Sequence, residues 1–168
     1  MGNQFRVPKQ CHCGDIKVRG HKCAVKVQYY VVGFMFDTEG KFVNLIQKIK
    51  PEWQKGLFNG IGGKIEKGES AYDAMVREFK EETGVHCEDW TMYMQISGPG
   101  LSSWVVYFFY SFSPKVFKTL SVTDEEVVLF SVDHLPKNII TNLKWLIPMA
   151  LDPNCRKDVI TNEHVASF

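Results

Sequence analysis

The stretch GKIEKGESAYDAMVREFKEETGV, residues 63–85, decides most of what this sequence predicts. Its second half predicts a helix over residues 70–83, because alanine, methionine and phenylalanine recur there at helical spacing. Ser70 is suited to cap the start of that helix, and Gly84 is suited to end it. Its first residues belong to an apolar but glycine-rich segment, residues 57–65, which predicts a strand whose backbone must bend or approach another group closely.

The predicted helix carries three glutamates on one face. Glu78, Glu81 and Glu82 stand at positions i, i+3 and i+4, so their carboxylates are neighbours. Like charges at this spacing repel, and the cluster is explained if a divalent cation neutralises it. Carboxylate oxygens suit Mg²⁺ or Mn²⁺. The alternative for an arbitrary helix is a solvated acidic face.

The spacing of the fixed residues favours the metal. Gly63 is followed after five residues by Glu69, and after seven more by the run REFKEETGV, residues 77–85. This pattern resembles the Nudix box, the signature of the Nudix hydrolase superfamily, at every fixed polar or glycine position. Phe79 stands where an aliphatic residue is commoner, which changes packing and removes no chemical group. The resemblance implies an enzyme, a pyrophosphohydrolase, and an α/β/α sandwich with a mixed sheet between helices.

The resemblance also implies a role for each residue of the box. Glu69 and Arg77 would brace the loop against the helix, although without the box they would be taken as an ordinary surface ion pair. Mg²⁺, for which Mn²⁺ can substitute, would polarise a phosphoryl oxygen and activate a water molecule. The implied metal ligands are backbone or side-chain oxygens of Gly62, Gly63, Glu78, Glu81 and Glu82.

A general base is the remaining requirement for hydrolysis. It is one of the three helix glutamates or a carboxylate outside the helix, since members of the family differ in this respect. Glu126 is our first choice outside the helix and Glu125 the second, because both precede an apolar stretch, residues 127–130. An acidic turn between strands explains the two residues equally well.

The segment before the box bears on the substrate. Residues 58–64, FNGIGGK, resemble the corresponding stretch of MutT-like nucleoside triphosphate pyrophosphohydrolases, which puts Asn59 near a base and makes Lys64 a further substrate-binding candidate. Asn142 lies where those enzymes contact the base, but the family's acidic residues are absent there. An amide can pair with a base edge, or it can cap a helix, and for Asn142 we favour the cap.

Basic and aromatic residues around the box are further candidates. Lys48, together with Lys50 and Lys55, could meet the phosphate tail, and an aromatic residue could stack on the base. Pro99, fifteen residues beyond Gly84, lies near where ADP-ribose pyrophosphatases carry a proline, although a turn explains it as well. The aromatic candidates for stacking are Phe34, Trp53 and Trp145.

These observations rank three hypotheses for function. The first is Mg²⁺-dependent hydrolysis of a nucleoside diphosphate linked to another moiety. We expect this substrate to be a (deoxy)nucleoside triphosphate, cleaved to a monophosphate and pyrophosphate as part of nucleotide-pool sanitation. The second is an ADP-ribose or dinucleoside polyphosphate pyrophosphatase. The third is a Nudix module that senses a nucleotide without cleaving it, against which the intact box argues.

The rest of the chain predicts an α+β domain over residues 25–168. Strands are expected at residues 27–36, 41–48, 57–65, 91–97, 103–113 and 127–132, with a second helix at residues 141–151. The apolar stretch 104–112 fits either the core or the interface of a homodimer. The 168 residues carry a net charge of +1, which gives no general attraction to nucleic acid or membrane.

Residues 1–24 form a polar and basic N-terminal extension. No signal peptide or membrane span is recognisable, so a cytoplasmic location and reduced cysteines are expected. The extension gathers Cys and His residues closely enough for a Zn²⁺ site, although unligated residues in an extended lead-in explain them too. The four candidate zinc ligands are Cys11, Cys13, His21 and Cys23.

Overall fold

The computed structural model describes residues 27–98, 104–155 and 160–164, the last as backbone only. Two helices and seven strands make up most of it, joined by three short 3₁₀ helices, Glu52–Gln54, Pro114–Lys118 and Val132–His134. The strands and helices are β1 Gln28–Phe36, β2 Phe42–Gln47, β3 Phe58–Asn59, α1 Ala71–Thr83, β4 Thr91–Ser97, β5 Trp104–Phe112, β6 Glu126–Ser131, α2 Leu143–Leu151 and β7 Ile160–His164.

All seven strands belong to one mixed sheet. Its order is β3-β2-β1-β5-β4-β7, and β6 pairs with β2 outside this path. β1 is antiparallel to β2 but parallel to β5, along a register that runs without a break from Gln28↔Trp104 to Phe36↔Phe112. The long parallel pair places β1 in the middle of the sheet, where both of its faces are covered.

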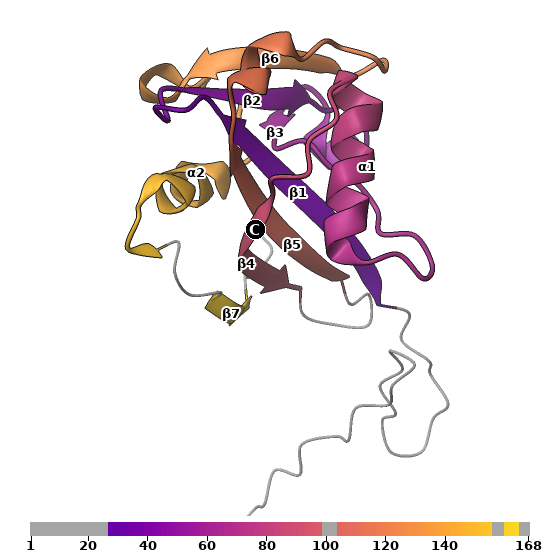
Figure 1. Ribbon diagram of the computed structural model, residues 1–168. Helices are drawn as coiled ribbons and strands as arrows, with labels where there is room; N and C mark the ends of the chain where they lie inside the picture. The colour runs from indigo at the N-terminus through magenta and orange to yellow at the C-terminus, as the bar shows by residue number, and fades with distance from the viewer. Residues whose placement is uncertain (1–26, 99–103, 156–159, 165–168) are drawn as a thin grey trace, which may run out of the picture.

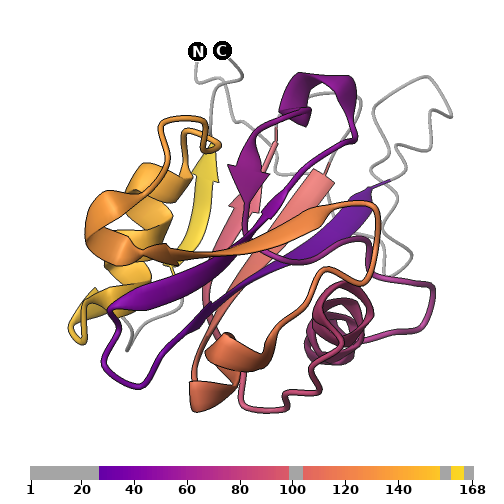
Figure 2. The same ribbon diagram turned by 90° about the horizontal axis from the view of Figure 1, so that it is seen from above.

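The two helices cover opposite faces of the sheet, as Figures 1 and 2 show. Successive side chains of β1 alternate between the faces. Val31 and Met35 pack in the cluster on the α1 side, whereas Phe34 and Phe36 pack in the cluster that includes α2. The predicted α+β sandwich with a mixed sheet between helices is therefore confirmed.

Most predicted elements are confirmed, including both helices. Ser70 caps α1 by accepting a hydrogen bond from Asp73 N–H, and Gly84 ends the helix in the left-handed conformation. The single strand predicted over residues 57–65 is wrong. Only Phe58–Asn59 forms a strand, and beyond it the glycine-rich chain bridges singly to β1 at Ile61 and Lys64.

The apolar stretch 104–112, for which the sequence allows either a core or an interface, is β5 and lies between β1 and β4. Its middle residues Phe108 and Phe109 are buried in the core, one on each face of the sheet. The N-terminal extension and its four candidate zinc ligands lie outside the described residues. Neither helix of the described part combines the length and the apolar character needed to span a membrane.

Candidate active site

α1 presents its glutamates to the glycine turn that follows β3. The side chains of Glu78 and Glu82, one helical turn apart, are 14% and 12% exposed. Gly62 N–H donates a hydrogen bond of 3.0 Å to Glu82 Oε2. Glu81 is 58% exposed and lies at the rim. Two of the three predicted carboxylates are thus buried together, and the third faces solvent.

The two glycines of the turn are required by close contacts. Gly62 has a φ of 151°, and a Cβ built there would lie 2.2 Å from the carbonyl oxygen of Val31. A Cβ on Gly63 would lie 2.6 Å from both carboxylate oxygens of Glu78. The carbonyl of Gly63, one of the predicted metal ligands, accepts a hydrogen bond from Val31 N–H at 2.9 Å. The turn is therefore held between β1 and α1, and Glu78 fills the space that a side chain would need.

Arg77 joins the loop before α1 to the glutamates on it. Its guanidinium donates two hydrogen bonds to Glu69, at 2.8 and 2.9 Å, and one of 3.0 Å to the carbonyl oxygen of Lys64. The remaining nitrogen contacts Glu78 at 2.9 Å and Glu81 at 3.2 Å. The hydrogen bonds from Arg77 lower the pKa of Glu69, and those to Glu69 raise the pKa of Arg77 itself. Such a two-pronged contact fixes geometry as well as charge.

Burial perturbs the two inner carboxylates. Desolvation raises the pKa of Glu82 to about 7, against an opposing effect of Lys48 and of the Gly62 N–H. Desolvation also raises the pKa of Glu78, which Arg77 opposes. The charged forms of both groups are therefore costly to keep in this pocket unless a cation accompanies them.

Lys48, just after the end of β2, supplies one such cation. Its ammonium is bonded to the carboxylate of Glu125 and lies 4.0 Å from Glu82 Oε1. The side chains of Lys48 and Glu125 are only 14% and 13% exposed. Glu125 also accepts a hydrogen bond of 2.9 Å from the backbone N–H of Ile49. A carboxylate from outside the helix is therefore fixed beside Glu82.

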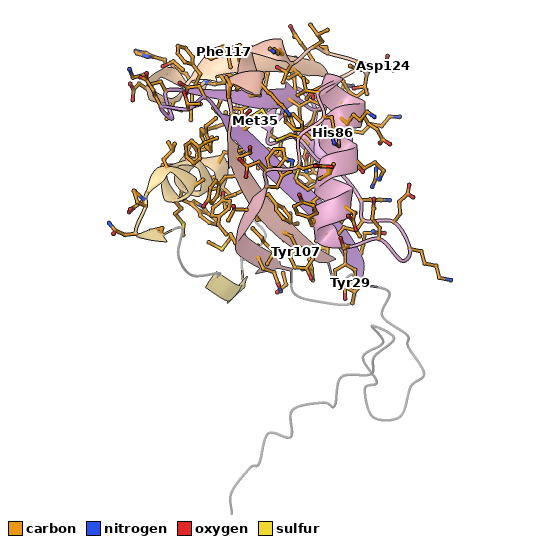
Figure 3. The ribbon with its side chains drawn as sticks, in the orientation of Figure 1. Tyr29, Met35, His86, Tyr107, Phe117 and Asp124 are labelled. Atoms are coloured by element: carbon orange, nitrogen blue, oxygen red, sulfur yellow. The ribbon has the colours of Figure 1, made fainter. Side chains whose placement is uncertain are left out.

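The outside carboxylate at the cluster is Glu125, our second choice from the sequence. Glu126, the first choice, begins β6 and is exposed. Consecutive residues of an extended chain point in opposite directions, so only one of the two can face the cluster. Asp124, the preceding residue, lies beside the C-terminal end of α1 (Figure 3), where Val122 N–H bonds the carbonyl oxygen of Glu82. This contact brings the turn that carries Glu125 against the helix.

A cleft of about 480 Å³ opens beside the cluster on the α2 face of the sheet. Its lining combines apolar and aromatic side chains of β1, β4 and β5 with lysines, asparagines and the glycine turn. Trp53 from the 3₁₀ helix Glu52–Gln54 stands at its edge, 69% exposed. The cleft thus has room for an aromatic ring beside a charged group. The predicted substrate residues that line it are Lys48, Asn59, Lys64 and Asn142.

The two asparagines offer hydrogen-bonding groups to a ligand. Asn59 Oδ1 accepts from Gly60 N–H at 2.8 Å, so the Nδ2 group is its remaining donor. Asn142 precedes the first residue of α2, but its side chain makes no capping hydrogen bond, so the capping role favoured from the sequence is wrong. Its Oδ1 is buried and has no partner in the described part of the chain. An unpaired buried acceptor in a cleft is costly unless a ligand or water satisfies it.

Only one of the three aromatic candidates lines the cleft. Phe34 is fully buried in the core and Trp145 packs against the same cluster, whereas Trp53 is at the cleft. Sequence reasoning missed Tyr30 and Trp104, which line it from the first residues of β1 and β5. Tyr30 and Trp104 are separated from Val32 and Phe108 by an even number of positions, so the sequence could have predicted that they lie on the α2 face. It could not have predicted that a cleft opens beside them. Lys50 also lines the cleft, and Lys55 pairs with Glu52.

The carboxylates have the chemistry of a Mg²⁺ site, with two cations of the chain placed among them. In the described residues no three acidic, histidine or cysteine side chains converge as a ready set of ligands. Instead Arg77 contacts both Glu78 and Glu81, and Lys48 contacts both Glu82 and Glu125. Oxygen donors that are buried, mutually repelling and backed by a turn without side chains fit a hard divalent cation. The donor set is therefore suitable, provided that these side chains can rearrange.

Comparison with known protein families identifies one domain. The NUDIX domain family model matches residues 26–148. Among curated proteins, the 8-oxo-dGDP phosphatase NUDT18 of Homo sapiens is 41% identical over 81 residues, which is 48% of this chain and 24% of the human protein. The Mus musculus protein of that name is 38% identical over 80 residues, with the same two shares. The chain thus spans about a quarter of the length of these relatives.

Solved structures share the fold at lower identity. The MutT NUDIX hydrolase of Burkholderia pseudomallei superposes with a TM-score of 0.61 at 19% identity, covering 73% of this chain and 97% of that one. The MutT protein of Methanosarcina mazei superposes with a TM-score of 0.60 at 18% identity, covering 73% and 91%. At this level of identity the likeness concerns the fold alone.

Proposed function

This chain belongs to the NUDIX family, and from that premise we propose that it is a Mg²⁺-dependent pyrophosphohydrolase that acts on nucleotides. The observation that carries the proposal is the adjacency of two environments in one cleft. Lys48 and the glycine turn lie next to Glu78 and Glu82. They line the same cleft as Trp104 and two asparagines. A polyphosphate and an aromatic base would find their partners side by side.

The substrate we propose is a (deoxy)nucleoside triphosphate or diphosphate, cleaved between the α- and β-phosphates. Water adds to one phosphorus atom, and the bridging oxygen leaves with the other phosphoryl group. The products are a nucleoside monophosphate and either pyrophosphate or phosphate. The name of the human relative includes a purine nucleoside diphosphate, 8-oxo-dGDP, and this supports a role in nucleotide-pool sanitation. Pro99, the basis of the ADP-ribose alternative, lies outside the described residues.

The base would be held in the apolar part of the cleft. Tyr30 and Trp104 supply aromatic surface there, and Trp53 supplies it at the edge. Asn142 lines the cleft, and its Oδ1, which has no partner among the described residues, would accept from an N–H donor of the base. The Nδ2 group of Asn59 would donate to an oxygen or nitrogen of the base. The amides therefore favour a base that presents both a donor and an acceptor.

The chemical step would take place at the carboxylates. Glu78, Glu81 and Glu82, with backbone oxygen of the glycine turn, would hold Mg²⁺, which when bound polarises a phosphoryl oxygen and lowers the pKa of water. Glu125 is our candidate for the general base, because it is fixed beside Glu82 without belonging to α1. Lys48 and Lys64 would balance phosphate charge from the cleft wall. Glu69 would keep Arg77, and thereby the loop, in place.

We also propose a cytoplasmic enzyme whose partner is its small nucleotide substrate, rather than nucleic acid or membrane. The overall charge of +1 supports this, since it gives no general attraction to polyanions. A homodimer stays an open prediction. Sedimentation at several concentrations would test it, and a tagged chain would report the compartment.

The decisive experiment is turnover across a nucleotide panel with product identification. The panel holds normal and oxidised nucleoside di- and triphosphates, ADP-ribose and dinucleoside polyphosphates, each with Mg²⁺ or Mn²⁺. We expect a monophosphate product and a loss of most activity in Glu78→Gln and Glu81→Gln, which should fold normally. Lys118→Met is the control, because Lys118 is exposed and no residue of its 3₁₀ helix, Pro114–Lys118, lines the cleft. Binding without turnover across the whole panel would replace the enzyme by the sensing module.

A further inference from the structure

Lys48 is a lysine enclosed by the carboxylates it would have to share with a metal ion. Its ammonium contacts Glu125 and lies 4.0 Å from Glu82, and all three side chains are less than 15% exposed. Either an ammonium or a divalent ion can supply the positive charge that neutralises the two buried carboxylates. The two cannot occupy that position together.

The backbone of Lys48 is fixed by hydrogen bonds, but its side chain can turn from the carboxylates into the cleft. Lys48 N–H donates to the carbonyl oxygen of Leu57, and its own carbonyl accepts from Gly56 N–H. The same residue lines the cleft in which we place the phosphates. A four-carbon stem on a fixed backbone can turn its ammonium from the carboxylates to an anion in the cleft.

We propose that Lys48 is a positioning residue that couples nucleotide binding to divalent-ion binding at Glu82, next to Glu125. Without nucleotide, its ammonium neutralises the two carboxylates and opposes a divalent ion there. When a polyphosphate enters, the ammonium moves to a phosphate oxygen, which leaves Glu82 available to the ion and Glu125 available to a water molecule. This inference rests on the proposed function, because it concerns the same phosphates and the same ion.

The coupling has a measurable consequence in the absence of any turnover. Because binding free energies are linked, a nucleotide that withdraws Lys48 must tighten ion binding by the factor by which the ion tightens nucleotide binding. Removing the Lys48 ammonium by mutation should tighten ion binding even when no nucleotide is present. Lys48→Met therefore binds the ion more tightly than the wild type and gains less from nucleotide.

The test is a Mn²⁺ titration followed by electron paramagnetic resonance. Mn²⁺ is titrated with and without a nucleotide analogue whose α,β-bridging oxygen is replaced by an imido group. In the nucleotide-free protein we expect Lys48→Met to tighten Mn²⁺ binding at least about fivefold, and Lys48→Arg to restore the wild-type value. Lys50→Met is the matched control, since Lys50 lines the same cleft but is exposed. In the background of Glu125→Gln the effect of Lys48→Met should shrink.

The outcomes separate this inference from the proposed function. Equal or weaker Mn²⁺ binding by Lys48→Met, or the same change in Lys50→Met, overturns the coupling even if the enzyme turns over nucleotides. Tighter binding in Lys48→Met together with no turnover by the wild type keeps the coupling and rejects the hydrolase. Thermal unfolding monitors folding, and Lys48→Gln replaces Lys48→Met if the latter does not fold.

Discussion

Replacing Glu82 by glutamine should stabilise the metal-free protein at alkaline pH while it abolishes hydrolysis. Burial raises the pKa of Glu82 to about 7 in the folded chain, from an ordinary value of 4.5. The groups that face it are Lys48 from the end of β2, Glu78 on α1, Glu125 before β6, and the N–H of Gly62. Glutamine keeps the shape and can still accept the hydrogen bond from Gly62, but it carries no charge to desolvate.

The sign follows from proton binding. Below pH 4.5 Glu82 is protonated in both the folded and the unfolded chain, and the variant gains nothing. Between 4.5 and about 7 the unfolded chain releases the proton while the folded chain retains it, so wild-type stability falls as the pH rises. Above about 7 the loss is complete, and the distance between the two pKa values corresponds to about 3 kcal/mol.

Urea unfolding followed by tryptophan fluorescence measures this difference. Both proteins are unfolded in the presence of a chelator at pH 5, 6, 7 and 8. The variant should be more stable than the wild type by less than about 1 kcal/mol at pH 5 and by about 3 kcal/mol at pH 8. Mg²⁺ should then stabilise the wild type more than the variant. A difference that does not change with pH, or a variant that is less stable at pH 8, refutes the assignment of Glu82 as a buried and desolvated carboxylate.

Three further predictions concern the rest of the site. Glu125→Gln should lower kcat about 100-fold or more in steady-state assays with Mg²⁺, because it removes the proposed general base. The kcat of Glu126→Gln should stay within about threefold of the wild-type value. A larger loss in Glu126→Gln than in Glu125→Gln would make Glu126 the base. Gly63→Ala should cost about 1–3 kcal/mol in urea unfolding and most of the activity, because its Cβ would collide with the carboxylate of Glu78. Gly68→Ala, which puts its Cβ in open space but at a φ of 86°, should lose stability through backbone strain alone and keep its activity; a Gly63→Ala variant as active and stable as the wild type would dismiss the collision. Asn142→Leu should lower kcat/KM about 10- to 100-fold with unchanged or slightly higher stability, since it removes a buried oxygen that has no partner; a large loss of stability would show that the side chain is structural.

The helices and most strands were predictable because their signals are local. The periodicity of α1, its cap at Ser70 and its end at Gly84 all lie within fifteen consecutive residues. The segment 57–65 misled for a physical reason. Its apolar residues suit a strand, but the turn at Gly62 carries the chain between β1 and the carboxylates of α1. β7, five residues long and largely polar, has no comparable pattern in the sequence.

Residues of the site that depend on distant contacts were less predictable. The choice between Glu125 and Glu126 is made by an ion pair with Lys48, 77 positions away in the sequence. Trp104 has the pattern of a core residue and is at the cleft because it pairs with Gln28 at the start of β1. A one-residue change of register would turn either side chain to the other side of the sheet. The box, in contrast, places Glu78 and Glu82 together through helix geometry alone.

The net charge of the carboxylate cluster explains why binding of a divalent ion and the position of the chain's own cations depend on each other. Five carboxylates are connected by ion pairs to only two cations, so above pH 7 the group keeps about three negative charges. A polyphosphate alone would be repelled by that excess at close range. It can enter only if cations come with it or are released to it, and Lys48 is the cation that lies both at the carboxylates and at the cleft. Neutralising the cluster by mutation should therefore weaken the dependence of nucleotide binding on divalent ions, even where catalysis is lost. The five carboxylates are Glu69, Glu78, Glu81, Glu82 and Glu125, and the cations are Lys48 and Arg77.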